Sequence, residues 1–242
     1  MLWFKKKNKT DQNNVREHTT EYSAGSEDSF VDKKEFGRKD CLENLDEVLT
    51  SKSKGTVLKL YIENFKRLNQ VFGYLYCETL LTKIIRYLQR ETGYVVYRYI
   101  GVEFIIIMED CPHGQAVSIA ENIIERFDHV WKVEDTDCLC SAQIGLCSYP
   151  GPAGTADELL KCLDMAVSHG TEKGSNQTII YDQELHDRFV RRQMIAKYLN
   201  TAITKGETEV SYRPIYDREK KGFSRAEFQM RIFVPELGMI DS

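Results

Sequence analysis

Two spacings of apolar residues run through the chain, one typical of helices and the other of strands. Leu42, Leu45 and Val48 recur at helical spacing, which predicts a helix that begins near Phe36. Residues 57–62 form an apolar run that predicts a strand buried on both faces. The same reasoning predicts helices over 77–90, 114–129 and 155–169, and strands over 94–99, 103–108, 138–148 and 179–181.

The C-terminal part of the chain has a different pattern. A stripe at helical spacing predicts one long helix over 183–204, which Gly206 would end. Its members are Leu185, Phe189, Ile195, Tyr198, Leu199, Ala202 and Ile203. Two strands are predicted over 208–216 and 223–232, and another helix is expected to start within 235–242.

Strands that alternate with helices around one central hairpin predict an α+β sandwich, in which helices flank a mostly antiparallel sheet. We expect a disordered polar tail over 1–35, because its residues have little to bury. A domain over 36–182 follows, then a linker helix over 183–205 and a short C-terminal segment over 206–242.

Composition and charge exclude several classes of protein. Of the 242 residues, 42% are hydrophobic and 29% are charged, which suits a real core under a polar surface. The net charge of −4 gives no general attraction to nucleic acid, so we expect no such partner. No apolar run reaches membrane-spanning length. Seven scattered cysteines and the lack of a signal peptide favour buried, reduced thiols in a cytoplasmic protein.

An octet between two predicted strands gives the strongest motif, Tyr97-Arg-Tyr-Ile-Gly-Val-Glu-Phe104. It resembles the hairpin signature "R-Y-G-G-D/E-E-F" of the GGDEF family, the diguanylate cyclases that join two GTP molecules into cyclic di-GMP. Further matches follow in the family's order: Phe65-Lys66-x-x-Asn69, Phe72-Gly73, Ile144-Gly145, Tyr149-Pro150 and Gly174-x-Asn176. The resemblance implies a nucleotidyl-cyclase-like sandwich over 36–182.

The resemblance also implies two metal-binding carboxylates, and both are replaced here. The cyclase reaction needs divalent cations to neutralise the triphosphate, and Mg²⁺ prefers carboxylate oxygens. The family's positions fall on Tyr61 and Val102, and neither carries a negative charge near neutral pH. Glu63 and Glu103 stand nearby as weak candidates. Because adjacent side chains of a strand point to opposite faces, Glu103 does not simply replace position 102.

The nucleotide contacts that the resemblance implies are partly kept. Asn69 stands at a guanine-binding position, and Glu78 stands where the family has Asp. Gly101 keeps one of two signature glycines, which let a backbone approach a phosphate or purine closely. The family's two phosphate-binding cations fall on Thr171 and Ser175, so both charges are lost. Mg²⁺ is the cofactor expected with any bound GTP, and no other is expected.

Residues 206–242 resemble the beginning of the EAL family of cyclic di-GMP phosphodiesterases. The matches are Tyr212-Arg-Pro-Ile215, Ala226-Glu-Phe-Gln-Met-Arg231 and Pro235-Glu-Leu-Gly238, and Glu227 falls on a metal-binding Glu of that family. A complete domain of this kind is a barrel of about 250 residues. We therefore expect an incomplete EAL segment of two strands with exposed edges. Such a segment should have no phosphodiesterase activity, and Glu227 is only a weak candidate for a metal ligand.

These losses predict a GGDEF-domain protein of bacterial cyclic di-GMP signalling that is catalytically inactive and acts as a regulatory or interaction module. Two alternatives stay open. One is a weakly active cyclase that uses Glu63 and Glu103 as displaced ligands. The other is a fragment of a GGDEF-EAL protein with no function of its own. GTP and cyclic di-GMP are the candidate ligands. The helix over 183–204 is expected to pack on the domain, or to form a homodimer or contact a protein partner.

Overall fold

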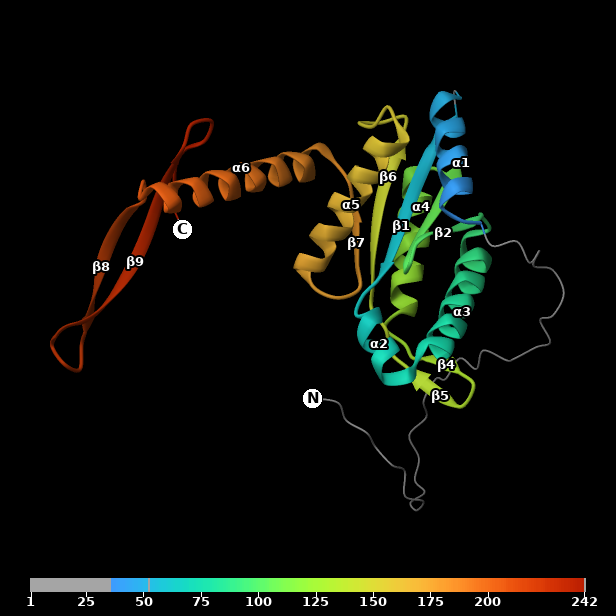
Figure 1. Cartoon of the computed structure of the whole chain (residues 1–242), viewed down its shortest axis with the longest axis horizontal. Helices are drawn as coiled ribbons and strands as arrows, with labels where there is room; N and C mark the ends of the chain where they lie inside the picture. Colours follow the sequence, from blue (N-terminus) through green and yellow to red (C-terminus); the bar gives the residue numbers. More distant parts are fainter. Residues whose placement is uncertain (1–35, 52, 242) are drawn as a thin grey trace, which may run out of the picture. The chain divides into compact units, whose positions relative to one another are not determined.

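The computed structural model of the chain describes residues 36–51 and 53–241. The tail predicted over 1–35 lies outside these residues. Within them, a domain is built around a central sheet, and a second, smaller sheet follows at the C-terminal end (Figure 1). No helix in the described ranges combines the length and the apolarity needed to cross a membrane.

The central sheet has five strands in the order β2-β3-β1-β6-β7. Neighbouring strands run antiparallel, except β6 and β7, which are parallel. The prediction of a mostly antiparallel sheet is therefore confirmed. The strands are β1 (Gly55–Ile62), β2 (Val96–Ile100), β3 (Glu103–Glu109), β6 (Ala142–Tyr149) and β7 (Gln177–Ile180).

Helices pack against both faces of this sheet, because the side chains of β1 alternate between two hydrophobic cores. Leu58, Leu60 and Ile62 lie in one core, whose other wall comes from α3 and α4. Val57 lies in the second core, which α1 and α5 complete. Figure 1 shows the helices around the strands: α1 (Arg38–Thr50), α2 (Phe65–Phe72), α3 (Tyr74–Thr92), α4 (His113–Arg126) and α5 (Ala156–Lys173).

The single strand predicted over 138–148 is wrong in its first part. Residues Thr136–Cys138 form β5, which pairs with β4 (Trp131–Val133) in a separate hairpin, and β6 begins only at Ala142. Cys138, Cys140 and Ala142 are all buried, so their alternation resembles one continuous strand. The start of α5 was predicted correctly, since the Thr155 side chain accepts a hydrogen bond from the backbone N–H of Glu158 at 3.2 Å.

The long C-terminal helix is confirmed as α6 (Gln183–Lys205). Its first turn is capped by Asp182, whose carboxylate accepts a hydrogen bond from the backbone N–H of Leu185 at 2.7 Å. Gly206, with φ of +70°, ends it. Most of the apolar stripe packs within the chain, although Ile203 is 56% exposed. Leu185 joins the second core, and the far end of α6 packs on the small sheet through Ile195, Tyr198, Leu199 and Ala202.

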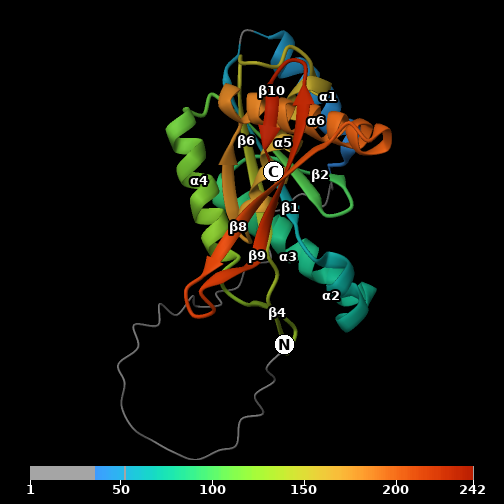
Figure 2. The ribbon, with the colours of Figure 1, turned by 90° about the vertical axis from the view of Figure 1, so that its left-hand side faces the viewer.

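The small sheet has three strands rather than the two that were predicted, in the order β10-β9-β8. Strands β8 (Glu209–Asp217) and β9 (Gly222–Val234) form the expected hairpin. The helix expected within 235–242 is wrong. After a turn in which the N–H of Leu237 donates to the carbonyl of Val234, Gly238 at φ of +77° returns the chain as β10 (Gly238–Asp241) along β9 (Figure 2).

All seven cysteines are buried and none forms a disulfide. Burial raises the pKa of the Cys41, Cys140 and Cys147 thiols to about 12. These three side chains are therefore protonated near neutral pH and pack as small hydrophobic groups, as predicted.

Candidate functional site

The tip of the β2–β3 hairpin is held by backbone hydrogen bonds on two sides. The N–H of Ile62, at the end of β1, donates to the carbonyl of Val102 at 3.2 Å. On the other side, the N–H of Arg98 donates to the carbonyl of Phe36 at 2.9 Å. Gly101 sits at the tip with φ of +57°, and nothing lies within 4 Å of the place where a side chain would begin. The tip is thus fixed in position while its outer surface stays open.

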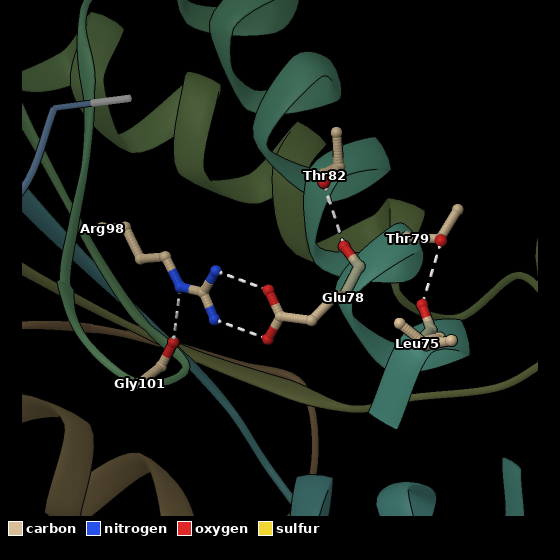
Figure 3. A network of polar contacts seen from close by, with 6 residues as sticks. All are labelled: Leu75, Glu78, Thr79, Thr82, Arg98 and Gly101. Atoms are coloured by element: carbon tan, nitrogen blue, oxygen red, sulfur yellow. Dashed lines mark hydrogen bonds and ion pairs between the residues drawn. The ribbon is translucent and has the colours of Figure 1, made fainter. Parts of the chain in front are cut away.

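Arg98 and Glu78 form the main polar contact beneath this tip (Figure 3). The two terminal nitrogens of Arg98 donate to the two carboxylate oxygens of Glu78 at 2.8 and 2.9 Å, and its Nε donates to the carbonyl of Gly101 at 3.0 Å. This hydrogen bonding holds the pKa of Glu78 below its ordinary value, against the opposing effect of burial. One guanidinium therefore ties helix α3 to the hairpin.

Glu78 keeps acceptor capacity even in this pair. An ionised carboxylate offers about four lone-pair sites, and Arg98 uses one on each oxygen. Tyr74 also hydrogen-bonds this carboxylate, which leaves capacity for a further donor such as an N–H of a guanine edge. Glu78 has a longer side chain than the Asp of the family, and its contact with Arg98 fixes the orientation of its carboxylate.

Asn69 contributes a buried polar atom that the protein leaves unsatisfied. Its Oδ1 is buried and has no hydrogen-bond partner within the described part of the chain. The residue lies on α2, which packs against α3, the helix that carries Glu78. A buried acceptor without a donor is unfavourable by about 1–3 kcal/mol, so a ligand that donates to it would regain that energy.

The two positions expected to bind metal carry side chains with no such capacity. Val102 is partly buried and packs on the core under α3 and α4. Tyr61 is half-buried at the end of β1, directly opposite Glu103 in the β1–β3 ladder. Carboxylates are therefore absent from both positions, although Tyr61 lies between the polar residues Glu103 and Gln143 in the neighbouring strands.

Glu103 points away from Val102 and into an ion-pair cluster around Lys59. The Nζ of Lys59 lies 2.9 Å from a carboxylate oxygen of Glu103 and also donates to Asp164 on α5. Only 5% of the Lys59 side chain is exposed. The Lys59 ammonium also lies 5.9 Å from the centre of the Tyr99 ring. The acid next to the lost metal position is thus already neutralised by an internal cation.

The pKa of Lys59 reflects this cluster. Burial alone would lower it, but the hydrogen bonds from Lys59 to Asp164 and Glu103 outweigh that effect, and the pKa stands above its ordinary value of 10.5. Lys59 is therefore positively charged throughout the physiological range.

The other candidate residues have no ligand-like surroundings. Glu63 follows β1, and its backbone N–H donates to the carbonyl of Ser141 at 2.8 Å. Thr171 donates its hydroxyl to the carbonyl of Val167 within α5, and Ser175 lies exposed in the turn after that helix. Glu227 lies exposed on β9 opposite Arg213. In residues 36–51 and 53–241, no group of three or more His, Cys, Asp or Glu side chains could hold a metal ion.

The sequence reasoning missed Lys59 and Asp164, which are 105 positions apart. A signal for Lys59 was present, because a lysine in the middle of a strand buried on both faces needs a partner. It also missed Gln143, whose side-chain amide donates to the carbonyl of Gly174 at 2.7 Å. That contact holds the turn in which Asn176 accepts from the N–H of Ala142, so this asparagine has a structural role.

Comparison by sequence finds similar proteins. The sequence model described as "Diguanylate cyclase, GGDEF domain" matches residues 37–177. The bifunctional diguanylate cyclase/cyclic di-GMP phosphodiesterase MucR of Pseudomonas aeruginosa is 22% identical over 160 residues, which are 65% of this chain and 23% of MucR. An uncharacterized signaling protein of Caulobacter vibrioides is 28% identical over 204 residues, 81% of this chain and 25% of that protein.

A solved structure agrees with the fold. The GGDEF domain of YfiN, also called TpbB, from Pseudomonas aeruginosa aligns with a TM-score of 0.59 at 22% identity. The alignment covers 65% of this chain and 95% of that domain. By contrast, the chain spans only about a quarter of the length of the two relatives compared by sequence.

Proposed function

The chain belongs to the GGDEF family of diguanylate cyclase domains, and on that premise we propose that it serves bacterial cyclic di-GMP signalling as a regulatory or interaction module without cyclase activity. The relative MucR, which combines cyclase and phosphodiesterase functions in its name, supports the signalling context.

The observation that carries the proposal is the Lys59 cluster beside two neutral metal positions. A metal ion would need carboxylate oxygens, and Tyr61 and Val102 supply none. Glu103 could reach a metal only by giving up its 2.9 Å pair with Lys59, which would leave that buried ammonium with Asp164 alone.

The base-reading side supports binding without turnover. Asn69 keeps an unsatisfied acceptor, and Glu78 is held by Arg98 with lone pairs to offer. Both groups suit the N–H donors of guanine. The candidate ligands are thus GTP and cyclic di-GMP, bound through the base, while Thr171 and Ser175 offer no charge to a triphosphate.

The segment 206–242 fits the proposed start of an EAL domain in its order of motifs, but it has no metal site of its own. Glu227 is exposed and lies opposite Arg213 in the β8–β9 ladder. We propose that the segment contributes no phosphodiesterase chemistry to this chain.

Incubation of the purified chain with GTP and either Mg²⁺ or Mn²⁺ tests the proposal directly. We expect no cyclic di-GMP above the level of a no-enzyme control. Formation of the product would refute it and favour the weakly active alternative, in which case Glu103→Gln should abolish the activity.

Calorimetric titration with GTP and with cyclic di-GMP separates a ligand-binding module from an inert fragment. We expect binding that needs no divalent cation and that Asn69→Ala weakens by about tenfold, because one buried hydrogen bond is lost. ATP is the matched control, since adenine has no N1–H to donate. If neither guanine nucleotide binds, the fragment alternative gains support.

A further inference from the structure

Strand β8 forms one edge of the small sheet and carries apolar side chains into solvent. Its ladder partner is β9, and within the described residues nothing pairs with its other side (Figure 2). Tyr212 is 72% exposed and Val210 is 44% exposed on this strand. Such an edge can pair with another strand, because its outward N–H and C=O groups have no hydrogen-bond partners in the sheet.

Pro214 shows which backbone groups face the free edge. It has no N–H, and a proline within a strand is tolerated where its nitrogen points away from the ladder. Backbone groups alternate in direction along a strand, so Val210 and Tyr212, which share the parity of Pro214, also direct their N–H and C=O groups outward. Ser211 and Arg213 direct theirs toward β9.

We propose that β8 pairs antiparallel with β8 of a second copy of this chain, around a twofold axis that passes beside Ser211. In this register Val210 forms a hydrogen-bonded pair with Tyr212 of the second copy. By symmetry, Tyr212 forms the same pair with Val210 of the second copy. Glu209 lies opposite Arg213 of the second copy, also twice. Two exposed apolar pairs and two opposite-charge pairs form at once, all by symmetry.

Charge selects this register over its neighbours. An axis one residue further along, beside Tyr212, places Glu209 opposite Ile215 and leaves the charge without a partner. An axis beside Arg213 places Glu209 opposite Asp217 and brings the two arginines together, which is repulsive. Only the Ser211 axis gives reciprocal Glu–Arg pairs between residues of β8.

The charged residues of these pairs have oppositely charged neighbours on β9, with Arg231 opposite Glu209 and Glu227 opposite Arg213, but no ion pair joins them. Neither Glu209 nor Arg213 forms an ion pair within the described part of the chain, whereas Arg231 on β9 is paired with Asp241 at 2.7 Å. Most of the apolar stripe of α6, the other surface expected to dimerise, packs on the core and on the small sheet, and Ile203 is its exposed member. The free edge of β8 is therefore the better candidate for contact between copies.

Sedimentation velocity of the full chain over a range of concentrations tests the dimer. Glu209→Arg or Arg213→Glu alone should weaken it by about tenfold or more, because two attractive pairs become repulsive. The double variant Glu209→Arg/Arg213→Glu restores opposite charges only in the proposed register and should recover the dimer. A monomer at all concentrations overturns the proposal, as does a dimer insensitive to both single changes.

A cysteine at the axis gives an independent readout of register. Paired residues that are not hydrogen-bonded lie about 4.5 Å apart at their Cα atoms, a separation that a disulfide tolerates. Oxidised Ser211→Cys should therefore give a covalent dimer, because the seven native cysteines are buried. Ser224→Cys on β9 is the matched exposed control and should stay monomeric in the gel. Equal cross-linking of both variants, or of neither, overturns the register.

Discussion

Replacement of Lys59 by methionine should destabilise the chain through the two acids that the lysine neutralises. Lys59 is 4% exposed in the middle of β1, and its ammonium pairs with Glu103 and Asp164. Methionine keeps most of the volume of the lysine stem and removes only the charge. The variant therefore isolates the ion pairs from the packing.

The expected magnitude follows from the exposure of the partners. Removing one member of a buried ion pair costs about 3–5 kcal/mol when the other charge stays buried. Here the Glu103 side chain is 26% exposed and that of Asp164 is 60% exposed, so water solvates much of what is left. We expect the free energy of unfolding at pH 7 to fall by about 2 kcal/mol. Lys59→Met/Glu103→Gln should recover about half of that loss, since the more buried acid is then neutral.

The pH dependence has a fixed sign. The folded chain holds the Lys59 proton more tightly than the unfolded chain does, because the pKa is raised above 10.5. Its contribution is complete below pH 10.5 and is lost as the pH rises through the folded pKa. Urea unfolding followed by circular dichroism between pH 7 and 11.5 should show the wild-type and Lys59→Met curves converging at the alkaline end. Equal stability of the two proteins at pH 7 would refute the assignment of Lys59 as an internal counter-ion.

Three further changes test other parts of the molecule. Arg98→Met should lower the free energy of unfolding at pH 7 by about 1–2 kcal/mol. Because the pKa of Glu78 is held below 4.5 by Arg98, the difference from wild type should shrink as the pH falls through that lowered pKa, and a difference that stays constant on acidification would contradict this. Gly145→Ala should cost about 1–3 kcal/mol in thermal or urea unfolding, since its Cβ would lie 2.9 Å from the carbonyl of Leu163, whereas Gly114→Ala, with open space around it, should cost nothing. The double variant Tyr61→Asp/Val102→Glu should bind Mn²⁺ measurably in calorimetry, whereas the neutral control Tyr61→Asn/Val102→Gln should not. Equal heats from the two variants would show that carboxylates at positions 61 and 102 do not form a metal site.

The sequence predicted most of the central sheet and its helices, because apolar spacing is a local property that each segment shows by itself. It failed where local spacing is ambiguous. Cys138, Cys140 and Ala142 alternate like one strand, although the chain breaks between β5 and β6. β10 has only four residues, and its strand character comes from pairing with β9 rather than from its own pattern.

The candidate site divides in the same way. The loss of charge at Tyr61 and Val102 could be recognised along the chain, since it depends only on which residues stand there. The Lys59–Asp164 pair and the Arg98–Glu78 pair could not, because each joins residues brought together by the fold across 105 and 20 positions. Residue identity thus showed which side chains stand at these positions, and only tertiary structure showed which residues they contact.

The two halves of the site have diverged in opposite directions. On the base side, Arg98 orders Glu78 and the Gly101 carbonyl in one network, which maintains a rigid acceptor at the position where the family reads guanine. Next to Val102, on the opposite face of β3, the Lys59 ammonium pairs with Glu103 and neutralises its charge. The combination is the one expected of a protein that recognises a guanine nucleotide and leaves its phosphates unreacted.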